Sequence, residues 1–182
     1  MPNHVYNTIE LSGDAIGLVR VMKKVSMPRP GAESKVEFDF HNLITPSGME
    51  QYKDSENWYD WNVANWGTKW NAYDVTVTDH IDHDHPYLNY SFSTAWSPPY
   101  GIIVTLAEYI TENCPGVSMY WHYEEEQGWG GIMQCGPGTG LVCVDEWDIP
   151  SSHEELVERK GVCYCQQDED YSPFGDCPRY EE

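Results

Sequence analysis

Residues 5–25, VYNTIELSGDAIGLVRVMKKV, contain the two periodicities that decide the fold. Val5–Leu11 alternates apolar and polar residues, which is typical of a half-buried β-strand, and Ser12-Gly13 ends this pattern. Asp14 then stands where a helix N-cap is expected. Four apolar residues follow at the i, i+3, i+4, i+7 spacing of an amphipathic helix: Leu18, Val21, Met22 and Val25. The stretch therefore predicts a strand followed by a helix over 14–25.

The same periodicities recur along the chain. They predict four further strands: 36–40, 72–78, 87–95 and 117–123. They also predict a second amphipathic helix over 99–113, and a tryptophan-rich segment near 55–67 that is inserted between strands. Strands alternating with helices favour an α+β fold with a ferredoxin-like split βαβ sheet. In this arrangement one sheet contains the strands 5–11, 36–40, 87–95 and 117–123, and both amphipathic helices cover the same face.

The ferredoxin-like domain is expected to span residues 1–135, and residues 136–182 to form a C-terminal extension. Within the extension, the turn sequence GPGTG at 136–140 favours a short hairpin. Ser151 and Glu154 have the spacing of a capping box, which predicts a short helix near 151–159. From Gly161 onward, signals for regular structure are few.

Charge is the most informative bulk property of the 182 residues. Thirty acidic residues oppose ten basic ones, for a formal net charge of −20 at neutral pH. Between residues 36 and 158 the only lysines and arginines are Lys53 and Lys69. Such a surface repels nucleic-acid phosphates and attracts basic proteins. The expected partner is therefore a protein with a basic surface, without direct nucleic-acid binding. The alternative is that the charge serves only solubility.

The sequence also bears on the compartment. No apolar run reaches the roughly 18 residues that a transmembrane helix needs, and the start of the chain lacks a signal-peptide pattern. A cytoplasmic protein without membrane association is expected, and its oligomeric state is left open. The six cysteines all lie in the second half of the chain, and reduced thiols are the expectation.

Two groups of residues have metal-ligand chemistry. The first is a polar loop with three histidines between carboxylates: His80, His83 and His85. The loop has no fixed turn to define a geometry, and a solvated surface loop explains it equally well. In the second group, Cys163-x-Cys165 and Cys177 lack C-x-x-C spacing, and Cys135, Cys143 or His153 could complete a set. No metal site and no cofactor are expected.

The tryptophans allow a structural and a ligand-binding interpretation. Packing of an inserted segment onto the sheet is favoured. Lys69, a lone lysine among tryptophans, is interpreted as a structural lock paired with Asp60 or Asp74. The alternative is a small pocket, whose candidate residues are Trp66, Lys69, Trp70, Tyr73 and Trp96.

No motif indicates catalysis, because the chain has neither a G-x-S-x-G sequence nor a P-loop. A non-enzymatic role is therefore favoured. The candidate partner-binding surface is an acidic face that imitates nucleic-acid charge. Its candidate residues are Asp79, Asp82, Asp84, Glu124, Glu125, Glu126, Asp145, Glu146 and Asp148.

The string WGTKWNAYD at 66–74 is distinctive, and it occurs together with MPNHVYN at 1–7, FDFHNLITP at 38–46, FSTAWSPP at 92–99 and EEEQGWGG at 124–131. In these segments, residues 1–135 resemble the YubB-like family of phage and plasmid proteins. The resemblance implies a ferredoxin-like fold, a mobile-element origin and a bacterial host cytoplasm, and it implies no catalytic activity.

The leading hypothesis is an acidic protein that inhibits a host defence protein by occupying its basic nucleic-acid-binding surface. The alternative is a small ligand-binding protein or enzyme that uses the tryptophan-lined region or the histidine loop, with or without a metal.

Overall fold

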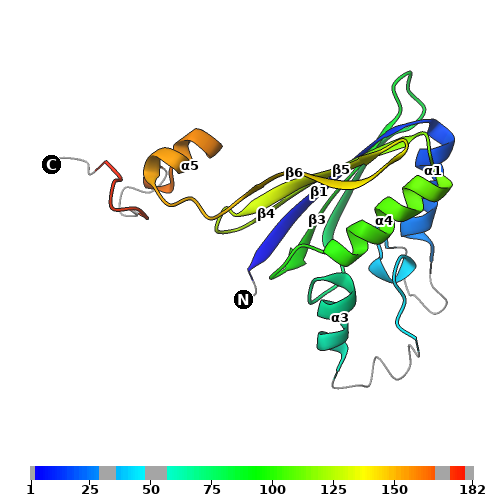
Figure 1. Cartoon of the computed structure of the whole chain (residues 1–182), viewed down its shortest axis with the longest axis horizontal. Helices are drawn as coiled ribbons and strands as arrows, with labels where there is room; N and C mark the ends of the chain where they lie inside the picture. Colours follow the sequence, from blue (N-terminus) through cyan, green and yellow to red (C-terminus); the bar gives the residue numbers. More distant parts are fainter. Residues whose placement is uncertain (1–2, 29–35, 48–56, 167–172, 179–182) are drawn as a thin grey trace.

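The structure of the protein is a computed structural model that describes residues 3–28, 36–47, 57–166 and 173–178 (Figure 1). Its main feature is a six-stranded sheet in which every neighbouring pair is antiparallel. The strand order is β2-β3-β1-β4-β5-β6. The strands are β1 (His4–Gly13), β2 (Tyr73–His80), β3 (Tyr87–Ala95), β4 (Val117–Glu125), β5 (Gly130–Gly136) and β6 (Thr139–Trp147).

Four α-helices accompany the sheet in the described ranges. They are α1 (Ala15–Ser26), α3 (Trp58–Trp66), α4 (Tyr100–Asn113) and α5 (His153–Lys160). Helices α1 and α4 contact each other and pack against the same face of the sheet (Figure 1). As predicted, Asp14 caps α1, with its side chain accepting a hydrogen bond from the Gly17 amide. The α+β class and both amphipathic helices are thus confirmed.

The core lies between these two helices and the sheet. On β1 the alternation is complete: Val5, Ile9 and Leu11 are buried toward the helices, whereas Tyr6 and Glu10 face solvent on the other side. The buried residues of both helices join the same apolar cluster as these strand residues. The second face of the sheet therefore carries polar and tyrosine side chains and stays accessible.

The prediction of a strand over 36–40 is wrong. This segment is irregular and leads into a 3₁₀ helix, η1 (Phe40–Asn42). Phe38 and Phe40 are both fully buried, because Phe38 stacks on Phe92 at 5.0 Å between ring centres and Phe40 packs edge-on against Trp66. Asp39 between them hydrogen-bonds to the following backbone, which competes with strand pairing. The outer neighbour of β3 is instead β2, which overlaps the stretch 72–78 that was also predicted as a strand and extends two residues beyond it.

The proposed boundary at residue 135 falls within a hairpin of the sheet. β5 and β6 are joined by a tight turn in which the Thr139 hydroxyl accepts a hydrogen bond from the Gly136 amide. β6 is the outermost strand, so the sheet extends to Trp147. The predicted helix near 151–159 is α5, but its cap is Ser152, which accepts from the Glu155 amide, rather than Ser151.

Beyond β6, α5 and the short helix η2 (Tyr164–Gln166) lie away from the main core (Figure 1). They surround a separate small cluster of Leu156 and three cysteines, with Val157 and Phe174 at its side. Among the described residues, no helix has the length and apolar character that crossing a bilayer requires. The described residues form one large apolar core between the sheet and the helices α1 and α4, and one very small core around α5.

Candidate functional site

The nine carboxylates of the predicted acidic face lie at two opposite ends of the sheet. Where β2 passes into β3, the chain carries Asp79, Asp82 and Asp84. This position is near the end of β1, because Tyr87 at the start of β3 pairs with Ser12. Glu124 pairs instead with Tyr6, near the start of β1. The other carboxylates on β4 and β6 lie at this second end, because the last residues of both strands align across β5.

The carboxylates at the second end differ in accessibility. Glu125 is only 2 % exposed and accepts hydrogen bonds from Asn3 and from the Gln127 amide, both at 2.6 Å, so it is a structural residue of the β4–β5 turn. Glu124 forms an ion pair with Lys160 of α5. The exposed carboxylates at this end are Glu126, Asp145, Glu146 and Asp148, which we name the acidic rim.

One member of the acidic rim is held by two tyrosines. Glu146 accepts hydrogen bonds from the hydroxyl groups of Tyr123 and Tyr100, which also contact each other. Burial raises the pKa of the Tyr123 phenol far above its usual value, and it raises the pKa of Tyr100 as well. Both phenols therefore remain neutral donors, and the charge at this position belongs to Glu146.

The edge beside the acidic rim is partly apolar. Among the described residues, β6 has a hydrogen-bonded neighbour on one side only. Val142 and Val144 on this strand and Ile149 just after it are about half exposed. An edge strand with exposed apolar side chains is a common docking position for another chain. Charged and apolar groups are thus combined on the same edge.

Lys69 lies among aromatic rings rather than beside its predicted carboxylate partners. Its Nζ is 4.2 Å from the ring centre of Trp96 and 4.7 Å from that of Trp70, which is cation–π geometry. Trp66 is separate from this group: it is buried in the main core and donates from Nε1 to the Ile44 carbonyl. Tyr73, half-buried, contacts His4 at 2.6 Å. The lysine ammonium thus lies against two of the rings of the candidate pocket, Trp70 and Trp96.

In the histidine loop, two of the three imidazoles meet. Nδ1 of His80 lies 3.2 Å from Nε2 of His83, and the His80 ring stacks on Tyr87. His85 is exposed. Within the described ranges, metal-ligating side chains with converging donor atoms are found after β6, and the histidine loop is not part of that group.

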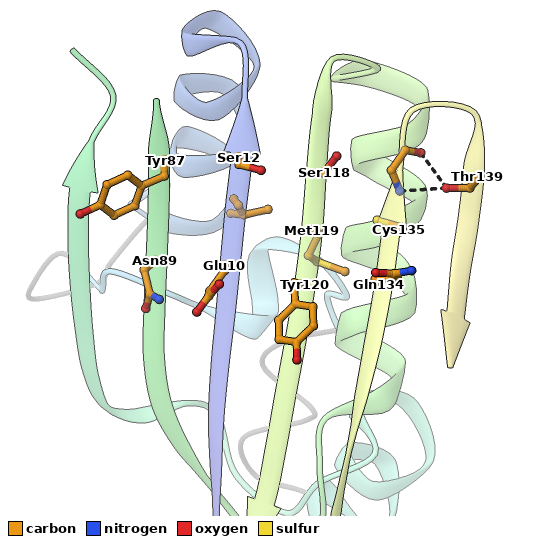
Figure 2. A pocket seen from close by; sticks show the side chains of 12 residues that line it. Glu10, Ser12, Tyr87, Asn89, Ser118, Met119, Tyr120, Gln134, Cys135 and Thr139 are labelled. Carbon is orange, nitrogen blue, oxygen red and sulfur yellow. Dashed lines mark hydrogen bonds between the residues drawn. The ribbon is translucent and has the colours of Figure 1, made fainter. Parts of the chain in front are cut away.

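A groove on the open face of the sheet was not foreseen from the sequence. It has a volume of about 530 Å³ and crosses strands β3, β1, β4 and β5, with both main helices behind the sheet (Figure 2). Tyr87, Asn89, Glu10, Tyr120 and Gln134 line it with mainly uncharged polar groups. The sequence signal was the polar residues that alternate with apolar ones along each strand. They identify the solvent-facing side of the sheet but do not indicate a groove.

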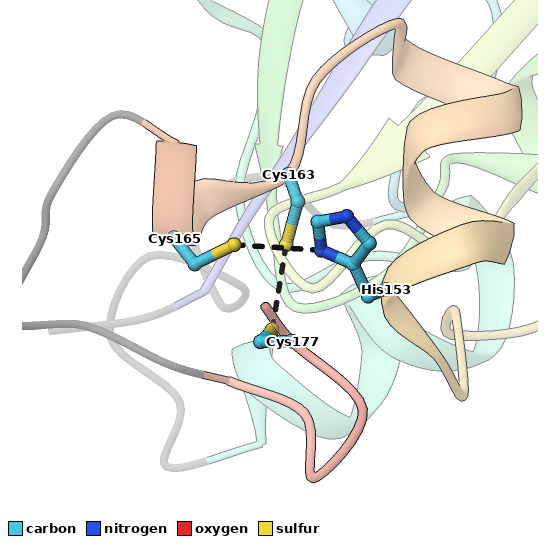
Figure 3. Close-up of side chains that lie close together, drawn as sticks. All are labelled: His153, Cys163, Cys165 and Cys177. Carbon is cyan, nitrogen blue, oxygen red and sulfur yellow. Dashed lines mark hydrogen bonds between the residues drawn. The ribbon is translucent and has the colours of Figure 1, made fainter. Parts of the chain in front are cut away.

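The converging group consists of His153, Cys163, Cys165 and Cys177 (Figure 3). His153 opens α5, the first two cysteines follow that helix, and Cys177 comes from the last described segment. The three cysteines are at most 6 % exposed, and all four donor atoms lie within 4.8 Å of one another. Burial and the two neighbouring thiols raise the pKa of the Cys165 thiol to about 12.

The structure thereby decides between the alternatives that the sequence left open for this cysteine group. Cys135 is buried in β5 under the sheet and Cys143 is exposed on β6, whereas His153 joins the other three cysteines. The sequence signal was a histidine at a helix start, a C-x-C pair and one distant cysteine, which is not a common metal-binding spacing. Comparisons with protein-family models, curated proteins and solved structures give no match for the chain.

Proposed function

We propose that the protein is a non-enzymatic interaction protein whose acidic rim binds a basic, nucleic-acid-binding surface of a host protein. The observation that carries this proposal is the grouping of exposed carboxylates at one end of the sheet, on the last residues of β6 and just after β4 and β6. Exposed charges act over about 8 Å, the Debye length at physiological salt. Such a surface accelerates association with a basic partner.

The neighbouring edge of β6 supports the same role. Charged contacts at an interface mainly guide association, whereas apolar contacts that lose water supply much of the affinity. Val142, Val144 and Ile149 provide apolar surface next to Asp145 and Asp148. A basic partner with an apolar patch would therefore meet both kinds of contact on one edge.

A mobile-element origin and a defence protein as the target belong to the same proposal. We infer a ferredoxin-like unit from β1 to β4, with α3 as an inserted helix and residues from β5 onward as an addition. The order β1-α1-β2-β3-α4-β4 and the neighbour order β2-β3-β1-β4 support this inference. The fold is the one that the resemblance to the YubB-like phage and plasmid family implies, and a bacterial host cytoplasm is the corresponding location.

The alternative of a small-ligand protein or enzyme at the tryptophan region or the histidine loop has less support. The Lys69 ammonium lies over the rings of Trp70 and Trp96, so this cation covers ring faces on which a ligand would stack. His80 and His83 contact each other, but two imidazoles alone supply too few ligands for a four-coordinate metal site.

The proposal is tested with two triple variants that change the charge equally. The rim variant is Glu126→Gln, Asp145→Asn and Asp148→Asn, which leaves the tyrosine-bound Glu146 intact. The control is Asp82→Asn, Asp84→Asn and Glu112→Gln, three exposed positions away from the acidic rim. Wild type is used to capture a partner from bacterial host lysate, and association rates are then measured by interferometry at low and high salt.

We expect the rim variant to associate more slowly at low salt and to lose most of its salt dependence, while the control stays near wild type. A DNA duplex should compete for the captured partner. Equal slowing in both triples would show that only total charge matters. No change in either triple would leave the acidic rim without a role in binding.

A further inference from the structure

We propose that His153, Cys163, Cys165 and Cys177 bind one zinc ion in a closed tetrahedral site, and that this ion holds the C-terminal module together. The C-terminal module is defined as α5, η2 and the segment 173–178. The proposal stands on the convergence of four ligand side chains from three separate segments (Figure 3). It does not depend on the role of the acidic rim.

The distances between donor atoms fit tetrahedral zinc. With Zn–S bonds of about 2.3 Å and a Zn–N bond of about 2.1 Å, tetrahedral angles place two sulfurs about 3.8 Å apart, and a sulfur and a nitrogen about 3.6 Å apart. The Sγ atoms of Cys163 and Cys177 are 3.9 Å apart, and Sγ of Cys165 is 3.4 Å from Nδ1 of His153. A disulfide would instead need sulfurs about 2.05 Å apart.

The ligand set selects the kind of metal and its role. Three thiolates and one imidazole are soft donors, which suit zinc and exclude hard cations such as Mg²⁺ and Ca²⁺. Four protein ligands fill a tetrahedral ion completely and leave no position for water or substrate, as in structural zinc sites. Binding would replace the three thiol protons by one Zn²⁺, leaving a complex with one net negative charge.

The size of the C-terminal module explains why it needs a metal. Its apolar cluster contains Leu156, with Val157 and Phe174 at the side, and the cysteines themselves fill the centre. A segment of this length rarely buries enough apolar surface to fold without a metal or disulfides. None of its three cysteines forms a disulfide. Metal binding would then supply the free energy that the small core lacks.

One further contact positions a ligand. The carboxylate of Asp176 accepts hydrogen bonds from the backbone amide of His153, at 3.0 and 3.1 Å. Asp176 is adjacent to Cys177, so this contact fixes the last segment against the start of α5. Two ligands from opposite ends of the module are thus brought together by an interaction that needs no metal.

The test uses the full chain, purified under reducing conditions and dialysed against metal-free buffer. Zinc content is measured by plasma mass spectrometry, and the apoprotein is titrated with Co²⁺ as a spectroscopic probe. We expect about one equivalent of zinc per chain, and intense visible and near-ultraviolet cobalt bands that report tetrahedral thiolate ligation. Cys163→Ser and Cys177→Ser should abolish both signals.

Two control variants separate this site from the other candidates. Cys143→Ser removes an exposed cysteine outside the group, and the double variant His80→Ala, His83→Ala removes the histidine pair. Both should keep the zinc and the thiolate bands. Loss of zinc in the histidine variant, with retention in Cys163→Ser, would overturn the proposal.

Because a cysteine variant could fail to fold, the wild-type protein provides a second measurement. Removing zinc with a chelator should make residues after Pro150 sensitive to limited proteolysis, leave the sheet intact, and be reversed by added Zn²⁺. Wild-type protein that neither retains nor rebinds zinc, or an apoprotein as protease-resistant as the zinc-loaded form, would refute the structural metal site. Isolation of a metal-free Cys163–Cys177 disulfide under these conditions would refute it as well.

Discussion

At the scale of single residues, Asp39 links two distant segments of the main core. Its carboxylate accepts hydrogen bonds from the backbone and ring of His41 at 3.0 Å and from the side chain of Asn71 at 2.8 Å. Asn71 in turn accepts from the Phe40 amide. Burial by itself would raise the pKa of Asp39, but these hydrogen bonds outweigh it and lower the pKa to about 2.

Asp39→Asn should therefore destabilise the protein in a pH-dependent way. The folded pKa lies below the usual value of 3.8, so the charge contributes stability above about pH 4 and loses it as the pH falls toward 2. The shift corresponds to about 2 kcal/mol of unfolding free energy at neutral pH. Urea denaturation across this pH range should show the variant less stable by that amount at pH 7 and equal to wild type near pH 2.

Asp82→Asn is the matched control for this measurement, because the same chemical change is made at an exposed position. It should alter stability by less than about 0.5 kcal/mol at neutral pH. A deficit for Asp39→Asn that is constant with pH would mean that the loss comes from packing and not from the carboxylate charge.

At the scale of elements, α3 and α4 touch through backbone atoms. Gly101, near the start of α4, faces the last turn of α3, and a Cβ at this position would lie 2.0 Å from the Asn65 carbonyl oxygen. α3 itself ends at Trp66, and the following Gly67, with a positive φ of 87°, forms its left-handed cap. The two glycines allow the short α3 helix to pack closely on the main core.

Gly101→Ala should destabilise the protein by about 2 kcal/mol or more, because the overlap involves rigid backbone and cannot be relieved by a side-chain rotation. Helix propensity alone predicts the opposite sign, a gain of roughly 1 kcal/mol. Gly140→Ala in β6 is the control, since nothing lies within 4 Å of its added Cβ. Thermal and urea unfolding measure both variants, and equal stability of the two would contradict close helix packing at Gly101.

At the scale of the whole molecule, unbalanced negative charge opposes folding. The net charge is −20, and several described cations are already engaged: Lys160 with Glu124, Arg159 with Glu155, and Lys69 with aromatic rings. Bringing so many carboxylates together in a compact structure costs free energy through repulsion. Dissolved salt screens this repulsion, with a Debye length of about 10 Å at 0.1 M that falls to about 3 Å at 1 M.

The melting temperature should therefore rise steadily with sodium chloride, most steeply at low concentration. Glu108→Gln with Glu112→Gln, two exposed positions on α4, should raise the melting temperature at low salt and reduce its dependence on salt. Sucrose at matched osmolarity controls for solvent effects other than screening. A melting temperature that falls or stays constant with salt would show that self-repulsion is not a significant term in the stability.

Local sequence patterns predicted most of the fold. They failed where the apolar residues of a pattern are buried without forming the predicted secondary structure. Alternation predicted β1, β3 and β4, and helical spacing predicted α1 and α4, since each of these elements buries one face against a single core. The alternation of Phe38 and Phe40 is equally regular, yet both rings are buried under the sheet without strand pairing. An alternating apolar pattern therefore reflects which side chains are buried, and it does not require the hydrogen bonds of strand pairing.

The amino-acid sequence by itself determined the net charge, the amphipathic elements and the types of ligand side chain that the chain contains. Only the tertiary structure decided which of these residues meet. Strand register separated Asp82 from Asp145 by the length of the sheet, and chain reversal after α5 brought Cys177 to His153. The physical reason is that composition and periodicity act within a few residues along the chain. Contacts between distant residues depend instead on strand register and chain reversal, which are fixed only when the whole chain packs.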